Sequence, residues 1–99
     1  MSFSDLVTED IRLVILRTLA ETNGYSCNES IIHSILAKFG HKCSRDQVKT
    51  QLAWLREQGL VTLDEVVDIY VATITDRGID VASGCATVPG VKRPRPRGC

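Results

Sequence analysis

Two short amphipathic segments, separated by only four residues, limit most strongly how this chain can fold. Residues 26–39 and residues 44–58 each place apolar side chains at helical spacing. Ser26 and Ser44 each stand three residues before a Glu or Gln, the capping-box pattern of a helix start. The predicted inward residues are Ile31, Ile32, Ile35, Leu36 and Phe39 in the first segment and Val48, Leu52 and Leu55 in the second. Because residues 40–43 form so short a connection, the two helices are expected to meet at a steep angle, as in a helix-turn-helix.

Another helix is predicted to precede this pair, beginning near Thr8 and ending at Asn23 and Gly24. Its apolar residues form two stripes on nearly opposite faces. One stripe consists of Ile11, Val14, Ile15, Thr18 and Leu19, and the other of Leu13, Leu16 and Ala20. A surface helix of a small monomer needs a single apolar stripe. We therefore expect this helix to be covered on both sides, by the rest of the domain or by a second subunit, and we predict a homodimer through it.

The apolar period changes from 3.6 to 2 after Gly59. Residues 60–63 and 69–74 are rich in β-forming side chains, and the five residues between them include three acids. They predict a two-stranded hairpin with an acidic tip, followed by a short helix that begins after Thr75 and ends at Gly84. The predicted fold class is mainly α with a small β-hairpin (α+β), in the order α-α-α-β-β-α.

The charges of the chain are unevenly distributed along it. The 12 basic and 12 acidic residues cancel to a formal charge of zero, but every acid lies at or before Asp80. The last fifteen residues contain all three prolines and four bases, which are Lys92, Arg93, Arg95 and Arg97. Because prolines lack a backbone donor and like charges repel, residues 85–99 are expected to form a flexible basic tail. Residues 1–84 are expected to form the folded domain.

Two motifs between Ser44 and Gly78 follow each other in an order known from one superfamily. Ser44-x-x-Gln47-Val48-x-x-x-Leu52-x-x-Leu55-x-x-x-Gly59-Leu60-Val61 is similar to the recognition helix and first wing strand of winged-helix bacterial regulators. Ile74-Thr75-Asp76-Arg77-Gly78 resembles the Leu-Thr-x-x-Gly segment that follows the wing in those proteins. The resemblance implies a winged helix-turn-helix fold.

The chain as a whole resembles a family of small proteins encoded by Mu-like phages and prophages. Gln51–Leu55 and the tail segment Val88–Pro94 carry this resemblance, which covers nearly all 99 residues and leaves the biochemical role open. The N-terminus is acidic before it becomes apolar, the wrong order for a secretory signal. No apolar run approaches the roughly 18 residues that span a bilayer. We expect a cytoplasmic protein of a bacterial host cell, with no membrane contact.

The third predicted helix offers candidate DNA contacts. In a helix-turn-helix, the exposed start of the second helix of the motif enters the major groove. Arg45 suits guanine edges, Gln47 suits adenine, and Lys49 and Thr50 suit phosphates, with Arg56 further along. The four tail bases named above would add non-specific affinity. The leading hypothesis is a protein that binds double-stranded DNA through residues 44–58, assisted by the tail, with transcription regulation as the implied role.

The alternative hypothesis is a protein–protein interaction module without sequence-specific DNA binding. Three carboxylates at the predicted hairpin tip would repel a phosphate backbone, and they belong to Asp64, Glu65 and Asp68. Asp46 and Glu57 also offset two of the three bases on the third helix. Such a module would use the acidic wing or the side of the helix around Trp54, which we expect to pack at the domain edge.

No catalytic or metal-binding arrangement stands out in the sequence. His41 and Cys43 lie close together, but their spacing is not a recognised zinc motif, and no Cys-x-x-Cys occurs. Neither a Ser/His/Asp set nor a phosphate-binding loop is present. We therefore expect no enzymatic activity, no cofactor and no bound metal.

Overall fold

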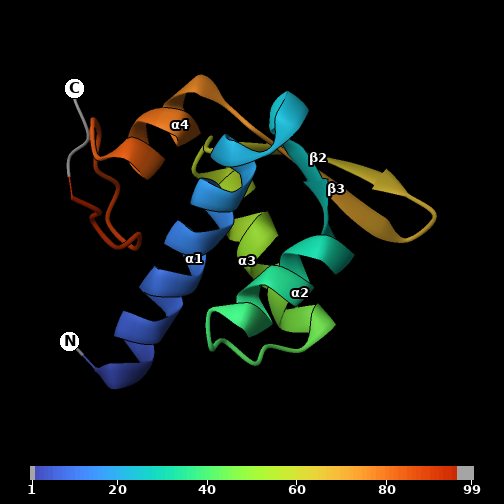
Figure 1. Ribbon diagram of the computed structural model, residues 1–99, viewed down its shortest axis with the longest axis horizontal. Helices are drawn as coiled ribbons and strands as arrows, with labels where there is room; N and C mark the ends of the chain where they lie inside the picture. Colours follow the sequence, from blue (N-terminus) through green and yellow to red (C-terminus); the bar gives the residue numbers. More distant parts are fainter. Residues whose placement is uncertain (1, 96–99) are drawn as a thin grey trace.

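Helices pack against a small antiparallel sheet, whose β2–β3 hairpin projects at one side, in the computed structural model, which describes residues 2–95 (Figure 1). The elements in chain order are α1 (Phe3–Glu21), the 3-10 turn η1 (Asn23–Tyr25), β1 (Ser26–Asn28), α2 (Glu29–Lys38), α3 (Arg45–Glu57), β2 (Val61–Val66), β3 (Ile69–Ile74) and α4 (Asp76–Ser83). The predicted α+β class is confirmed. The predicted order α-α-α-β-β-α lacks β1, which makes the sheet three-stranded in the order β1-β3-β2.

The strand β1 occupies the position where the sequence predicts the start of a helix. Ser26 pairs with Thr73 in the antiparallel register of β1 and β3, and the Thr73 hydroxyl donates to the Ser26 hydroxyl at 3.1 Å. Asn28 instead caps α2, since its side chain accepts from the amide of Ile31 at 2.9 Å. The capping box predicted for Ser26 and Glu29 is therefore wrong, because both side chains have partners in or beside the sheet.

The helix α1 begins five residues earlier than Thr8, because a capping box lies upstream. The Ser2 hydroxyl accepts from the amide of Asp5, and the Asp5 carboxylate accepts from the amide of Ser2. The predicted start rested on the Thr8 hydroxyl as a cap followed by Glu9 and Asp10, and it is wrong because Ser2 provides the cap. The cap, and not burial, sets the beginning of this helix.

Both apolar stripes of α1 are covered by the chain itself. Ile15 and Leu19 from one stripe and Leu13 and Leu16 from the other are all buried within the domain. α1 packs against α2, α4 and β3. The two stripes therefore offer no physical reason for the homodimer predicted through this helix.

The helices α2 and α3 differ in how well the predicted stripes match burial. Val48, Leu52 and Leu55 of α3 are fully buried, and the capping box of Ser44 and Gln47 is present. In α2, Ile32 and Leu36 are buried, whereas Ile31 is 49% and Phe39 is 66% exposed. The wide stripe predicted for α2 is thus a narrow one, and Phe39 remains as an exposed aromatic side chain at its end.

The hairpin is longer than predicted and has a tight turn. β2 extends to Val66, which pairs with Ile69, so that only Val67 and Asp68 form the connection. Both connecting residues have positive φ angles, 50° and 63°. This is the geometry of a two-residue turn whose twist matches that of the strands, but it is unfavourable for a β-branched residue such as Val67.

The short helix α4 begins as predicted, and a glycine holds it close to the sheet. The Thr75 hydroxyl accepts from the amide of Gly78 at 3.1 Å. A Cβ atom on Gly78 would collide with the carbonyl oxygen of Leu60, so the close contact requires glycine at this position. The left-handed Gly84 ends the helix.

The packed part of the chain continues beyond the boundary expected at residue 84. Val88 and Val91 belong to the hydrophobic core, with exposed fractions of 5% and 8%. The amide of Lys92 donates to the carbonyl of Glu9 at 3.2 Å, which fastens this segment to α1. Residues 85–95 therefore lie on the domain. Residues 96–99, including Arg97, lie outside the described residues.

Shortening the two C-terminal valines should destabilise the whole domain. We expect Val88→Ala and Val91→Ala each to lower the free energy of unfolding by about 1–2 kcal/mol, since each removes buried methyl groups. Thr87→Ala is the control, because Thr87 is exposed in the same segment. Urea unfolding followed by circular dichroism measures the effect. Midpoints equal to that of the control would show that this segment does not stabilise the core.

Candidate nucleic-acid interface

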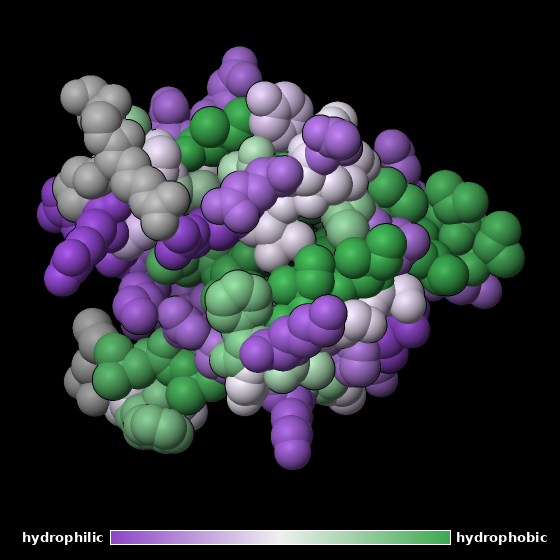
Figure 2. Space-filling view, viewed as in Figure 1, coloured by the Kyte–Doolittle hydropathy of each residue, from purple (hydrophilic) through white to green (hydrophobic). Residues whose placement is uncertain are grey.

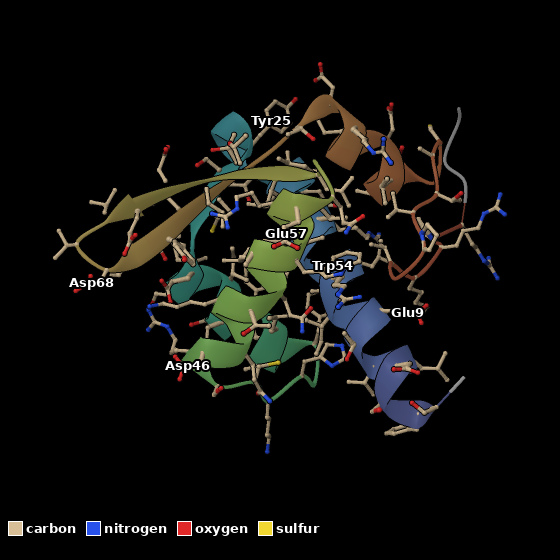
Figure 3. All side chains as sticks on the ribbon, turned by 180° about the vertical axis from the view of Figure 1, so that it is seen from behind. Glu9, Tyr25, Asp46, Trp54, Glu57 and Asp68 are labelled. Atoms are coloured by element: carbon tan, nitrogen blue, oxygen red, sulfur yellow. The ribbon has the colours of Figure 1, made fainter. Side chains whose placement is uncertain are left out.

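The helix α3 lies on the surface opposite the view of Figure 1, in which α1 covers it. Figure 3 looks onto α3, with Asp46 near its start, Glu57 at its end and Trp54 on the side that faces α1. The buried stripe of α3 fixes this orientation, because it turns the remaining faces of the helix outward.

The carboxylate of Glu29 joins three elements beneath the start of α3. Glu29 is fully buried at the start of α2, and its Oε1 accepts from the amide of Tyr70 in β3 at 2.7 Å. Arg45 Nε donates to Oε2 at 3.4 Å, and Lys49 Nζ lies 3.9 Å from Oε1. A buried carboxylate is costly without such partners, so the position of two bases on α3 is coupled to the integrity of the core.

Arg45 keeps part of its hydrogen-bonding capacity. Its side chain is partly exposed, and its bond to Glu29 uses Nε. Among residues 2–95, the two terminal amino groups of its guanidinium have no further hydrogen-bond partner. Glu29 therefore fixes the planar guanidinium through Nε. The two terminal amino groups, which can bind guanine or phosphate, stay available for a ligand.

Lys49 serves as a link between α3 and the hairpin. Its Nζ donates to the carbonyl of Asp68 at 3.1 Å and lies 5.8 Å from the centre of the Tyr70 ring. Together with the ion pair to Glu29, these contacts direct the ammonium group of Lys49 toward the hairpin. The role predicted for Lys49, a free phosphate contact, thus competes with contacts within the chain.

The remaining candidate residues on α3, which are Gln47, Thr50 and Arg56, do not form one continuous surface with Arg45. The Gln47 side-chain oxygen accepts from the amide of Ser44, and the Thr50 hydroxyl donates to the carbonyl of Asp46. Arg56 is exposed, but it lies about 16 Å along the helix axis from Arg45. The structure therefore brings Arg45 and Lys49 together at Glu29 and leaves Arg56 apart.

The described bases of the predicted tail lie on the α1 side of the domain. Lys92 Nζ is 3.4 Å from Asp10 Oδ1, and Arg93 and Arg95 line a groove together with residues of α1 and α2. The structure does not place these three bases beside Arg45. The prolines and charges from residue 85 onward predict a tail, whereas Val88 and Val91 are the sequence signal that this segment packs on the domain.

Trp54 packs at the domain edge, as predicted. The Arg12 guanidinium lies 3.7 Å from the centre of its ring, and Arg12 Nη1 donates to the carbonyl of Gly90 at 2.9 Å. Burial lowers the pKa of Arg12. A Cβ on Gly90, whose φ is +100°, would lie 2.7 Å from the Trp54 ring. Because Arg12 and the C-terminal segment cover it, the Trp54 side of α3 offers little surface to a partner.

The tip of the hairpin is apolar as well as acidic. Val67 is 89% exposed, and its neighbours Val66 and Ile69 are exposed too. Figure 2 shows this apolar tip at the right edge of the molecule. The prediction of an acidic tip considered only the three acids and did not consider the neighbouring Val66 and Val67.

Neither a metal centre nor a membrane span is found in the described part of the chain. No group of three or more His, Cys, Asp or Glu side chains between residues 2 and 95 could hold a metal ion. No helix in the same range is both long and apolar enough to cross a bilayer.

Asp10 connects the turn before α3 to the C-terminal segment, and its pKa is lowered. Burial raises this pKa, but the hydrogen bond from His41, at 2.6 Å, and the ammonium group of Lys92 outweigh it. The unfolded state therefore binds a proton more readily than the folded state. The stabilisation is present above the ordinary pKa of 3.8 and is lost as pH falls through the lowered folded value.

Replacing this carboxylate should have a pH-dependent effect. We expect Asp10→Asn to lower the free energy of unfolding at pH 7 by at most about 1 kcal/mol, since the side chain is a third exposed and screened by water. The difference between variant and wild type should shrink as pH falls below 3.8. Urea unfolding at several pH values measures it, and a difference that is constant with pH would contradict the proposed cause.

Removing the buried charge beneath α3 should be more harmful. Glu29→Gln retains an acceptor for the amide of Tyr70 but loses the ion pairs, and we expect it to lower the free energy of unfolding by about 1–3 kcal/mol. Glu57→Gln, on the exposed end of α3, is the matched control. Equal unfolding midpoints for the two variants would show that Glu29 does not hold the three elements together.

Comparison with known proteins places the chain among phage proteins. No protein-family model matches it. It is similar to gp26 of Escherichia phage Mu, an uncharacterized protein, with 54% identity over 94 residues that cover 95% of this chain and 97% of gp26. It is also similar to an uncharacterized protein of Haemophilus influenzae, with 55% identity over 78 residues that cover 78% of this chain and 76% of the relative. The chain therefore belongs to the family of phage proteins that includes gp26 of Escherichia phage Mu.

Proposed function

We propose that the chain is a winged-helix protein that binds double-stranded DNA through the first turns of α3. The observation that carries the proposal is the guanidinium of Arg45, which the buried Glu29 holds at the exposed start of this helix. In this proposal α2 and α3 form the helix-turn-helix, and the β2–β3 hairpin forms the wing. A guanidinium whose orientation is fixed in advance loses less entropy on binding a base edge or a phosphate.

The charge around Arg45 supports weak rather than strong electrostatic attraction. Lys42 is an exposed base in the turn before α3, whereas Asp46 is an exposed acid in the first turn of the helix. Two or three phosphate contacts are within reach of this surface, and they would give a slope of about −2 to −3 in a plot of log affinity against log salt. A regulator of transcription would also need base readout, for which Arg45 and Gln47 are the available side chains.

The wing and the tail take little part in this binding mode. The carboxylates at the hairpin tip disfavour contact with phosphates, so the proposed DNA path leaves the tip free. Lys92, Arg93 and Arg95 lie on the α1 side and are therefore not assigned to the interface on α3. Primary contact thus rests on α3 and the turn before it.

The second candidate function is a protein–protein interaction module. The exposed apolar side chains at the hairpin tip favour it, because a cluster of this kind is more typical of a protein contact than of a phosphate contact. It needs no contribution from Arg45. The two functions therefore predict different results for the same variant.

Arg45→Ala should weaken DNA binding about 5- to 150-fold, which corresponds to a loss of about 1–3 kcal/mol. Arg45→Lys should also bind more weakly than the wild type, since it retains the charge but loses the planar fork. Arg77→Ala is the matched control, because it removes an exposed base from α4. Fluorescence anisotropy with a labelled duplex, at salt concentrations of about 50–200 mM, measures the affinity. Circular dichroism checks that each variant is folded.

Two outcomes would reject this proposal. Equal affinities of Arg45→Ala and Arg77→Ala would remove α3 from the interface. Absence of salt-dependent binding by the folded wild type would remove DNA as the ligand and leave the interaction module as the function.

A further inference from the structure

The α1 side of the domain carries a groove with an apolar floor and a basic rim. It lies between α1, α2 and residues 92–95. Val14, Ile35 and the exposed ring of Phe39 contribute apolar surface. Five of the twelve Lys and Arg residues of the chain line it, and these are Arg17, Lys38, Lys92, Arg93 and Arg95.

The acids in the groove leave this basic character largely in place. Asp10 and Glu21 are the two acids that line it. Asp10 accepts from His41 and is paired with Lys92, which leaves Arg17, Lys38, Arg93 and Arg95 against the single acid Glu21. The groove therefore favours an occupant that offers carboxylates around an apolar centre.

The hairpin tip of the same chain has this chemistry. It places the side chains of Val66, Val67 and Ile69 among three carboxylates, those of Asp64, Glu65 and Asp68. In Figure 1 the hairpin projects on the right of the molecule, whereas the C-terminal segment that borders the groove lies on the left. A chain cannot place its own hairpin tip in its own groove, so contact between the two requires a second copy.

The backbone at the tip is a separate indication that the tip has a binding role. Val67 combines a φ of 50°, which is unfavourable for a β-branched residue, with almost complete exposure. Asn or Gly would suit this turn better, and nothing within residues 2–95 buries the valine side chain in return. Local strain of this kind is concentrated at binding sites.

We propose that the hairpin tip of one copy docks in the basic groove of a second copy. Because the two surfaces differ, the contact is head-to-tail, and each copy keeps one unused tip and one unused groove. Repetition gives a ring or an open chain of subunits. A tip of this size buries little area, so the association is weak, dependent on concentration and reduced by salt. The proposal does not depend on DNA binding.

Two variants each remove one of the surfaces. Val67→Asn removes the apolar centre of the tip and suits the positive φ, so the fold should be retained. Lys38→Glu combined with Arg93→Glu reverses two charges on the groove. Arg77→Glu is the control, since it reverses an exposed base outside the groove. Urea unfolding checks the stability of each variant.

Sedimentation velocity over a range of concentrations at low salt tests the proposal. The average mass of the wild type and of Arg77→Glu should rise above the monomer mass of 10.9 kDa as concentration increases. The tip variant and the groove variant should each lose that rise. Their equimolar mixture should form a one-to-one dimer and nothing larger, because it contains one intact tip and one intact groove that face each other.

Three results would overturn the inference. A wild type that remains monomeric at every concentration would show that the groove does not bind the tip of a second copy. A dimer that both variants retain would place the contact elsewhere, and a mixture that stays monomeric would show that the two surfaces do not bind one another.

Discussion

The arrangement of the candidate interface depends on one buried carboxylate. Glu29 connects the start of α2 with the amide of Tyr70 in β3 and with two bases of α3. Each of these contacts compensates part of the cost of removing the charge from water. The angle between the two helices, the position of the hairpin and the direction of Arg45 are therefore determined together. A side chain that looks like part of a surface cap in the sequence is the centre of this polar network.

Much of the fold follows from local sequence rules, and the exceptions have identifiable causes. The capping box at Ser44, the cap at Thr75 and the alternation of residues 69–74 predict α3, α4 and β3 because their determinants lie within a few residues. The strand β1 could not be predicted in this way, since three residues acquire strand geometry only by pairing with β3, more than forty residues later. The burial of Val88 and Val91 was not predicted, because the prolines and bases around them indicate a flexible tail.

The sequence predicts which residues belong to the candidate site, but it does not predict the contacts between them. Arg45 and Lys49 were recognised as bases on the exposed side of α3, and their spacing of four residues places them on the same face. The sequence does not reveal that Glu29 lies beneath both, nor that Lys49 reaches the carbonyl of Asp68. The zero net charge likewise conceals a spatial separation, with acids around the hairpin tip and bases around the groove on α1. The hairpin tip is a local segment, whereas the groove is formed by residues that are distant along the chain.

The packing of Val88 and Val91 against the domain also has a consequence for the order in which the protein can fold during synthesis. The helix α1 leaves the ribosome well before residues 88–92, and Lys92 contacts it through Glu9 and Asp10. These are among the least local contacts that a chain of 99 residues can make, and such contacts form late because they must close a long loop. A nascent chain therefore leaves part of the apolar core uncovered until residues 88–92 have been translated. The core can close completely only after residues 88–92 have left the ribosome.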